Sequence, residues 1–273
     1  MADSILIFDS GAGGLSILNE IRKQLPGTDI HYLMDTALFP YGEQHDACLQ
    51  ERIPDLCARA VATFTPAVVV LACNTASTLS LADVRSRVDI PVVGVVPAVR
   101  VAANRAREQH EHCVGLLATP ATVLRAYTDQ LIDDFARDLQ VERFGVAGLV
   151  NLAEAALCGE DIREELQQLI GPWLTQHPAM KRVVLGCTHY PLLADALQEL
   201  WPDTDWIDSG EAVARQTVRV YPQLSDKTDN SLPDNLLHCT GTVSLHWTGL
   251  EEPSGVIRYL TDTGHLKQAE RFN

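Results

Sequence analysis

The sequence predicts an α/β fold in which mainly parallel sheets are flanked by helices. Short, continuously apolar runs alternate with segments whose apolar residues recur at helical spacing. Strands that are apolar along their whole length are typical of parallel sheets covered on both faces. At 273 residues the chain can bury a large core, and we favour two modest domains over one large domain.

The elements follow from these patterns in chain order. Residues 5–8 predict a strand, and residues 15–25 predict a helix after the glycine-rich turn of residues 9–14. Further strands are expected at residues 30–34, 67–73, 91–96, 113–118, 182–187 and 206–208, with helices between most of them. In such sheets ligands collect at the carboxyl ends of the strands, so the polar turns that follow these strands are candidates for one crevice.

Three segments fit the alternation less well. Residues 144–149 are compatible with a short strand and residues 153–157 with the start of a helix. Residues 226–235, which are rich in Asp, Asn, Ser and Pro, predict a surface loop.

Two cysteines end predicted strands in similar settings. Cys73 follows Val-Val-Val-Leu-Ala, and Cys187 follows Arg-Val-Val-Leu-Gly. One cysteine at a strand end is more often a small buried apolar residue, but two in matching contexts favour a functional site. Thiols delivered from two halves of a chain suit a reaction that takes a proton from one side of a substrate and returns it on the other. A second echo, Asp208-Ser209-Gly210 with Asp9-Ser10-Gly11, hints at a duplicated and rearranged half.

Helix starts are expected after both cysteines. Asn74 and Thr75 are typical N-cap residues, so Cys73 should lie near the positive end of a helix dipole, which favours a thiolate. Thr188 and Pro191 predict a comparable helix start after Cys187. The seven cysteines are odd in number and scattered, so we expect reduced thiols.

The turn at Asp9 has two possible roles. Asp9 suits the ammonium group of a ligand, while Ser10 and the amides of the glycine turn suit a carboxylate. A dinucleotide fingerprint fails, because Ser16 stands where its last glycine is required. The alternative is a tight turn without a ligand.

The segment that begins at Asp35 also has two possible roles. It places an acid, a hydroxyl, Tyr41 and Gly42 in one loop, which suits a small polar ligand or an ordinary turn. His189 suits a proton donor or a hydrogen-bond partner for a carboxylate, and otherwise caps or packs a helix start. No metal is expected, because neither Cys187 with His189 nor the cluster around Cys113 has a recognised zinc spacing.

Composition narrows the classes of partner. A net charge of −15 disfavours nucleic acid and anionic lipid, both of which are bound mainly through Lys and Arg. No apolar run approaches the roughly 18 to 20 residues that a membrane span requires, and no basic leader precedes an apolar core. We therefore expect a cytoplasmic protein that binds a small molecule.

Five strings of the chain match one known family: Phe8-Asp9-Ser10-Gly11-x-Gly13-Gly14-Leu15-Ser16, Asp35-Thr36-x-x-Phe39-Pro40-Tyr41-Gly42, Ala72-Cys73-Asn74-Thr75-Ala76-Ser77, Gly94-Val95-Val96-Pro97-Ala98 and Leu185-Gly186-Cys187-Thr188-His189-Tyr190-Pro191-Leu192. In these strings the chain resembles the glutamate racemases of the aspartate/glutamate racemase family, which make D-glutamate for bacterial peptidoglycan without a cofactor. The strings occur in order over most of the chain.

The resemblance implies two pseudo-symmetric α/β domains with the active site in the cleft between them. The first domain would comprise residues 1–97 and 209–273, and the second residues 98–208. A homodimer, L- or D-glutamate as the small-molecule substrate, and no cofactor are implied as well. Two alternatives stay open: a racemase of aspartate or another acidic amino acid, and a binding or regulatory protein that uses such a cleft without turnover.

The resemblance also implies roles for individual residues. Cys73 and Cys187 would be the acid and base on opposite faces of the substrate α-carbon, with Cys73 acting on D-glutamate and Cys187 on L-glutamate. The family's acidic residue in the second domain would fall on Glu154, and Asp9 and His189 would assist the thiols. Contacts to glutamate are implied for Asp9, Ser10, Tyr41, Gly42, Asn74, Thr75, Thr188 and His189.

Overall fold

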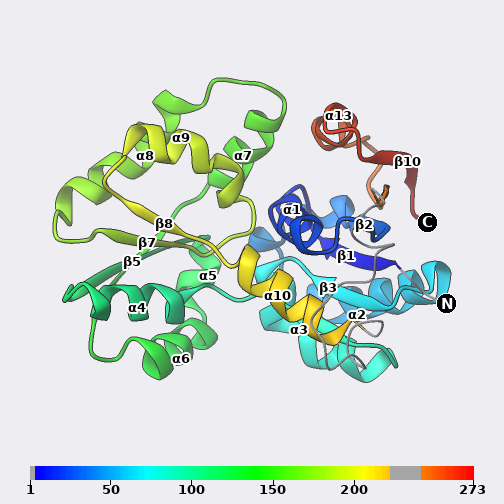
Figure 1. Ribbon diagram of the computed structural model, residues 1–273, viewed down its shortest axis with the longest axis horizontal. Coiled ribbons are helices and arrows are strands. Elements are labelled where there is room, and N and C mark those ends of the chain that lie inside the picture. Colours follow the sequence, from blue (N-terminus) through cyan, green and yellow to red (C-terminus); the bar gives the residue numbers. More distant parts are fainter. Residues whose placement is uncertain (1–3, 222–240) are drawn as a thin grey trace. The chain divides into compact units, whose positions relative to one another are not determined.

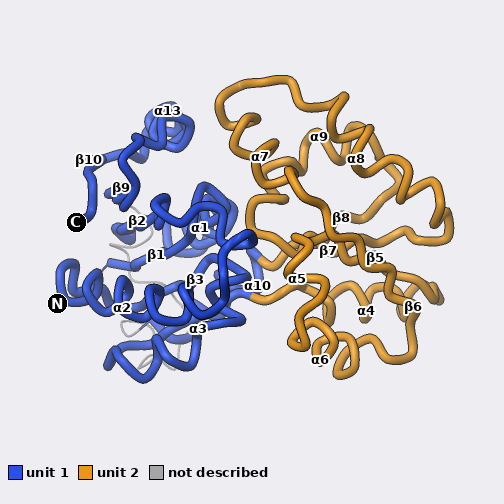
Figure 2. The backbone as a smooth tube through the Cα atoms, turned by 180° about the vertical axis from the view of Figure 1, so that it is seen from behind, with its two compact units in different colours: residues 1–95, 210–273 blue, residues 96–209 orange. Residues whose placement is uncertain are grey.

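The computed structural model describes residues 4–221 and 241–273, and the chain divides into two compact units (Figures 1 and 2). Unit 1 comprises Met1–Val95 and Gly210–Asn273, and unit 2 comprises Val96–Ser209. The loop predicted at residues 226–235 lies outside the described residues. The domain boundaries given above stay a prediction, because compactness alone does not show that a unit folds independently.

Unit 1 contains a six-stranded sheet in the order β10-β9-β2-β1-β3-β4, and every neighbouring pair is parallel. The strands are β1 (Ile5–Asp9), β2 (Ile30–Met34), β3 (Val68–Leu71), β4 (Val92–Gly94), β9 (Val243–Trp247) and β10 (Leu266–Arg271). The predicted parallel α/β sheet is thus confirmed. The sequence did not predict β9 or β10: β10 is a mostly exposed edge strand, so it lacks the continuous apolar run of a buried strand.

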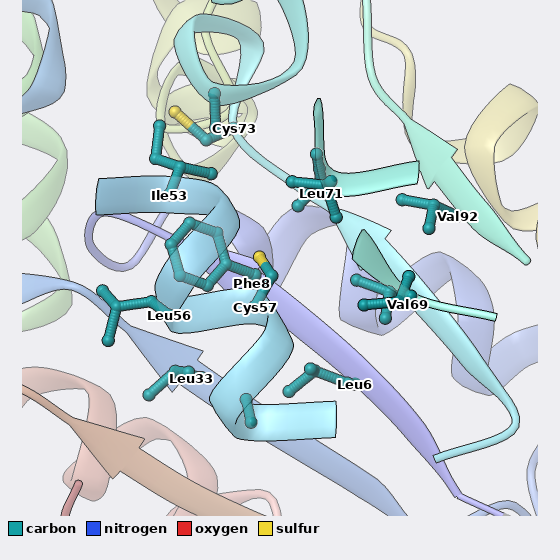
Figure 3. Packing of buried hydrophobic residues seen from close by; sticks show 14 of the residues in the cluster. Leu6, Phe8, Leu33, Ile53, Leu56, Cys57, Val69, Leu71, Cys73 and Val92 are labelled. Atoms are coloured by element: carbon teal, nitrogen blue, oxygen red, sulfur yellow. The ribbon is translucent and has the colours of Figure 1, made fainter. Parts of the chain in front are cut away.

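Helices cover both faces of this sheet. They are α1 (Gly14–Gln24), α2 (Asp46–Phe64), α3 (Asn74–Arg87), α10 (Gly210–Val220) and α13 (Ser254–Asp262), with short 3₁₀ turns η1 (Thr36–Leu38) and η2 (Tyr41–Glu43). α1 packs against α10, and α2 packs against α3 on the other face (Figure 1). Strand residues Leu6, Phe8, Val69 and Leu71 bury their side chains against α2 and α3. Within this cluster Cys57 is fully buried, whereas Cys73 lies at one end (Figure 3).

Unit 2 contains a four-stranded sheet in the order β6-β5-β7-β8, again with every neighbouring pair parallel. The strands are β5 (Cys113–Ala118), β6 (Gln140–Gly145), β7 (Arg182–Leu185) and β8 (Asp205–Ile207). The strand expected at residues 144–149 begins earlier, at Gln140, and Leu149 already starts a helix. β6 is an edge strand without a buried residue, so its sequence carries little apolar signal.

Helices also cover both faces of the unit 2 sheet. They are α4 (Val99–Glu108), α5 (Pro120–Leu124), α6 (Ala126–Phe135), α7 (Leu149–Leu157), α8 (Arg163–Gln176) and α9 (Ala194–Leu200), with the 3₁₀ turn η3 (Tyr190–Leu193). α4 packs against Leu116 and Val184 on one face. α7, α8 and α9 pack against Leu117 and Leu185 on the other (Figure 1). In the described parts of both units, no helix is long and apolar enough to cross a bilayer.

The two units share one strand order. The spatial strand order β2-β1-β3-β4 in the sheet of unit 1 corresponds position by position to the order β6-β5-β7-β8 in unit 2. Cys73 follows β3 and Cys187 follows β7, so the two thiols occupy equivalent places. The other echo does not mark equivalent positions: Asp9 ends the central strand β1, whereas Asp208 follows the edge strand β8. The cysteine echo therefore reflects the repeated topology, and the short Asp-Ser-Gly echo does not.

A pair of histidines, His246 buried and His31 partly buried, joins β2 to β9 and leads to a stability prediction. His31 Nδ1 lies 3.2 Å from His246 Nε2, and both rings stack on Phe64. Burial lowers the pKa of both imidazoles, that of His246 to about 4. Asp29 and Glu270 face this pair and partly offset the effect of burial on His31.

We expect the free energy of unfolding to fall as the pH drops from about 6.5 towards 4. In that window the unfolded histidines bind protons that the folded ones do not, so protonation favours the unfolded state. Urea midpoints at pH 7.5, 6 and 4.5 check this, with His246→Gln as the comparison that should show a smaller decrease. A midpoint that stays constant or rises on acidification, or an identical decrease in the variant, would contradict the assignment.

Candidate active site

Three polar turns of unit 1 meet at one edge of its sheet. β1 lies between β2 and β3, and all three strands run parallel, so their carboxyl ends share that edge. Asp9 ends β1, Asp35 follows β2, and Cys73 follows β3. Backbone hydrogen bonds run from Asp35 N to Asp9 O and from Ala72 N to Phe8 O, each 2.8 Å long. The same sheet edge therefore carries a thiol and two carboxylates that are remote in sequence.

The glycine turn fixes Asp9 in a fully buried position. Asp9 Oδ1 accepts hydrogen bonds from the Gly11 amide at 2.9 Å and from the Ser10 hydroxyl at 3.3 Å. Tyr32 donates its hydroxyl to Gly11 O at 2.6 Å, and a Cβ at Gly14 would lie 2.7 Å from a Tyr32 ring carbon. The turn therefore has a packing role of its own, which is to let Tyr32 approach the backbone that holds Asp9 and Ser10.

The thiol of Cys73 lies at the start of helix α3. The prediction that Asn74 or Thr75 caps this helix is wrong: Cys73 itself is the N-cap, in an extended conformation, and Asn74 is the first helical residue. The free N–H groups of the first turn therefore begin directly after the thiol. Asn74 and Thr75 are both buried, and Asn74 Oδ1 accepts no hydrogen bond within the described part of the chain. A buried acceptor without a partner is what a ligand donor would satisfy.

A buried carboxylate network holds the loop that carries Tyr41 and Gly42. The Tyr41 hydroxyl donates to Asp35 Oδ2 at 2.7 Å, and Arg52 donates to both oxygens of Asp35 at 2.7 Å. Thr248 donates to Asp35 Oδ1 at 2.5 Å. Burial, together with Asp35, raises the pKa of Tyr41, so its hydroxyl stays protonated. The Tyr41 proton is therefore engaged by Asp35, and the loop of η2 that carries Tyr41 and Gly42 is held to this carboxylate.

Cys187 lies at the carboxyl end of β7 in unit 2. Thr188 and Pro191 predicted an α-helix directly after Cys187, but none begins there. The 3₁₀ turn η3 starts at Tyr190, and α9 follows only at Ala194. Cys187 is partly exposed, whereas Thr188 is buried. The two thiols therefore differ in setting, because only Cys73 directly caps an α-helix.

His189 links Cys187 to an acidic residue of a helix. Its Nδ1 lies 4.0 Å from Cys187 Sγ, and its Nε2 lies 3.1 Å from Glu154 Oε1. Glu154 belongs to α7, which packs against η3. A carboxylate at Nε2 fixes a proton on that nitrogen and turns Nδ1 towards the thiol. Residues 187, 189 and 154 thus form a relay in which His189 can exchange a proton with Cys187.

Two groups were considered as zinc sites: Cys187 with His189, and the cluster around Cys113. Among the residues that the structure describes, no group of three or more His, Cys, Asp and Glu side chains could hold a metal ion. No disulfide joins any of the six cysteines that are described.

Comparison with known proteins shows the family of this chain. The Asp/Glu/Hydantoin racemase family matches residues 10–217. The chain belongs to this family. It is 46% identical over 255 residues to the glutamate racemase of Pectobacterium carotovorum, covering 91% of this chain and 87% of that one. The glutamate racemase of Shewanella halifaxensis is 41% identical over 273 residues, 99% of this chain and 98% of its own.

A solved structure shows the same fold. The crystal structure of Escherichia coli glutamate racemase, in complex with L-glutamate and the activator UDP-MurNAc-ala, superposes with a TM-score of 0.87 at 36% sequence identity. The match covers 100% of this chain and 98% of that chain. The described part of the chain thus has the fold of that glutamate racemase.

Unit 2 of this racemase holds a pair of hydroxyls that sequence reasoning missed. Thr119 follows β5, which pairs with β7, and Gly186 N donates to Leu117 O at 2.7 Å, so Thr119 lies at the same sheet edge as Cys187. The Thr119 and Thr122 hydroxyls are 2.8 Å apart, and both residues are buried. A polar residue directly after a predicted strand was the available signal, the same one that identified Cys187.

Proposed function

We propose that this protein interconverts L- and D-glutamate without a cofactor, with Cys73 and Cys187 as the two bases. The observation that carries the proposal is that the thiols follow equivalent strands, β3 and β7, in two units of the same strand order. Relatives named glutamate racemase, which match nearly the whole chain at 41–46% identity, support glutamate as the substrate.

The chemistry needs one thiolate and one thiol. The thiolate removes the α-hydrogen as a proton, which leaves a carbanion at the α-carbon, and the opposite thiol gives its proton to the other face and becomes the thiolate. An α-proton beside a carboxylate is weakly acidic, so the thiolate must be desolvated and fixed donors must neutralise the carboxylates. The family resemblance assigns removal of the D-glutamate proton to Cys73 and of the L-glutamate proton to Cys187.

The other proposed site residues assist the thiol of their own unit or bind the substrate. Asp9 shares the sheet edge with Cys73 and would assist it, while His189, held by Glu154, would assist Cys187. Asn74 Oδ1, which accepts no hydrogen bond from the described residues, suits the substrate ammonium. Ser10, Thr75 and Thr188, together with the backbone of Tyr41 and Gly42, would bind the two carboxylates.

A partial reaction, elimination of chloride, measures the activity of each thiol independently of the other. Enantiomers have an equilibrium constant of one, so kcat/KM for racemisation must be equal in the two directions, whichever thiol is damaged. Loss of chloride from 3-chloroglutamate needs only removal of the α-proton: chloride leaves from the β-carbon, and the resulting enamine hydrolyses to 2-oxoglutarate and ammonia. The D enantiomer at the α-carbon reports Cys73, and the L enantiomer reports Cys187.

Glu154→Gln is expected to slow elimination from the L analogue about tenfold or more, because His189 loses the carboxylate that fixes its proton. Elimination from the D analogue should change much less, since Cys73 belongs to the other unit. Glu160→Gln, an exposed position just after α7, is the matched control and should leave both rates unchanged. Equal losses for the two enantiomers would show that Glu154 does not act through His189.

The proposal itself is tested by circular dichroism of L-glutamate incubated with the purified protein and no added cofactor, with and without chelator. Conversion in both cases is expected, and its absence overturns the proposal. The same assay with L-aspartate separates the alternative substrate. Exchange of the α-hydrogen for solvent deuterium separates turnover from binding alone.

The cellular setting follows from the resemblance to bacterial glutamate racemases. We propose a cytoplasmic homodimer whose product, D-glutamate, enters peptidoglycan synthesis and thereby supports cell-wall formation and cell shape. Light scattering of the purified protein measures the oligomeric state directly, and a monomer at micromolar concentration would contradict the dimer.

A further inference from the structure

Ser77, on the first turns of α3, connects three elements around Cys73 through one hydroxyl group. Ser77 Oγ donates to Leu71 O at 3.0 Å and accepts from Val95 N at 2.9 Å. Leu71 is the last residue of β3, and Val95 follows the last residue of β4. The backbone amide of Ser77 also donates to Cys73 O at 2.9 Å. The end of β3, the start of α3 and the end of β4 are therefore joined at this residue.

Burial and close packing around Ser77 prevent water from replacing the hydrogen bonds of its hydroxyl. Ser77 is buried, so water cannot readily replace its hydroxyl. A Cβ at Gly94 would lie 2.8 Å from a Leu81 methyl carbon and 3.3 Å from Ser77 Oγ. Glycine at position 94 thus allows α3 to approach β4 closely enough for the serine hydroxyl to reach Val95 N.

The bonds act on the peptide units that set the position of the thiol. Leu71 lies two residues before Cys73, and Ala72 N is held by Phe8 O at 2.8 Å. The Ser77 hydroxyl and amide fix the carbonyls of Leu71 and Cys73, one on each side of that anchor. A serine inside a helix ordinarily bonds the carbonyl three or four residues earlier, whereas Ser77 reaches back six residues to the strand.

We propose that Ser77 is a positioning residue that holds the Cys73 thiol in place for proton transfer. The inference rests on the proposed function, because it assigns to Ser77 the placement of one of the two bases. It predicts a defect confined largely to reactions in which Cys73 removes the proton. Cys187 belongs to the other unit and has no bond to Ser77 among the interactions described.

Ser77→Ala is expected to slow elimination from the D analogue of 3-chloroglutamate by about tenfold or more, since small displacements of a reacting group cost rate steeply. Elimination from the L analogue should fall by a smaller factor, so the ratio of the two rates changes. Ser77→Thr, which keeps a hydroxyl, should restore part of the ratio.

Ser80→Ala is the matched control. Ser80 lies one turn further along α3, is equally buried, and its hydroxyl has no partner in the described part of the chain. This variant should leave both elimination rates and their ratio unchanged. If Ser77→Ala lowers both rates by the same factor, or if Ser80→Ala shifts the ratio as much, Ser77 is structural only and the inference is overturned. If the wild-type protein neither racemises glutamate nor eliminates chloride, the proposed function has failed instead.

Discussion

Replacing Cys73 by alanine is expected to lower racemisation of glutamate by at least about a thousandfold, because a positioned proton-transfer group typically contributes factors of 10² to 10⁴. Cys73 lies at the sheet edge that also carries Asp9 and directly caps α3, whereas Cys57 of the same cluster is fully buried in the core. Loss of chloride from the L analogue should survive, because Cys187 alone removes that proton. Cys187→Ala should show the reverse pattern, with elimination surviving for the D analogue.

The measurement is circular dichroism for racemisation and 2-oxoglutarate release for elimination, with each variant at matched concentration. Cys48→Ala is a suitable control, because Cys48 is an exposed thiol on α2. Substantial racemisation by either single variant, or loss of both eliminations together, would refute the assignment of one base to each face.

Asp35→Ala is expected to destabilise the protein by about 2 to 4 kcal/mol. Removing one partner of a buried charge pair typically costs about 3 to 5 kcal/mol, and the partial exposure of Arg52 reduces that figure. Asp35 is fully buried and accepts hydrogen bonds from Tyr41, Arg52 and Thr248. The substitution leaves the Tyr41 hydroxyl buried without its acceptor and frees the loop before α2.

Urea unfolding measures this effect, read as the shift of the transition midpoint at pH 7.5. Asp55→Ala is the matched control: it removes the exposed Asp55–Arg59 pair, 3.7 Å apart on the same helix as Arg52, and should cost no more than about 0.5 kcal/mol. A shift for Asp35→Ala as small as that of the control would show that the network contributes little to stability.

Several features of the fold follow from local sequence patterns. The strands at Ile30–Met34 and Cys113–Ala118 have the predicted limits, because each is a buried, continuous or nearly continuous apolar run. The helix after the glycine turn is shifted by one residue only. Edge strands were harder to predict: β6 and β10 are mostly exposed, so neither needs the apolar run that marks a buried strand.

The capping pattern shows a limit of residue preference. Asn74 and Thr75 are good N-cap types, yet Cys73 takes that position, because the chain enters α3 immediately after the strand. Likewise Pro191 lies in the first turn of a helical segment, but that segment is the 3₁₀ turn η3, which starts at Tyr190, rather than an α-helix. Residue preferences thus located the helix starts after Cys73 and Cys187 to within a few residues. They could not decide which residue is the N-cap or whether an α-helix or a 3₁₀ turn forms.

Local sequence patterns were enough to predict the α/β alternation and the placement of Cys73 and Cys187 after two buried strands, since both are properties of short contiguous segments. Three contacts became visible only in the folded chain: Glu154 with His189, Thr248 with an aspartate 213 residues away, and Ser77 between β3 and β4. Those partners are brought together by packing of segments remote along the chain, and such contacts leave no periodic signal in either segment.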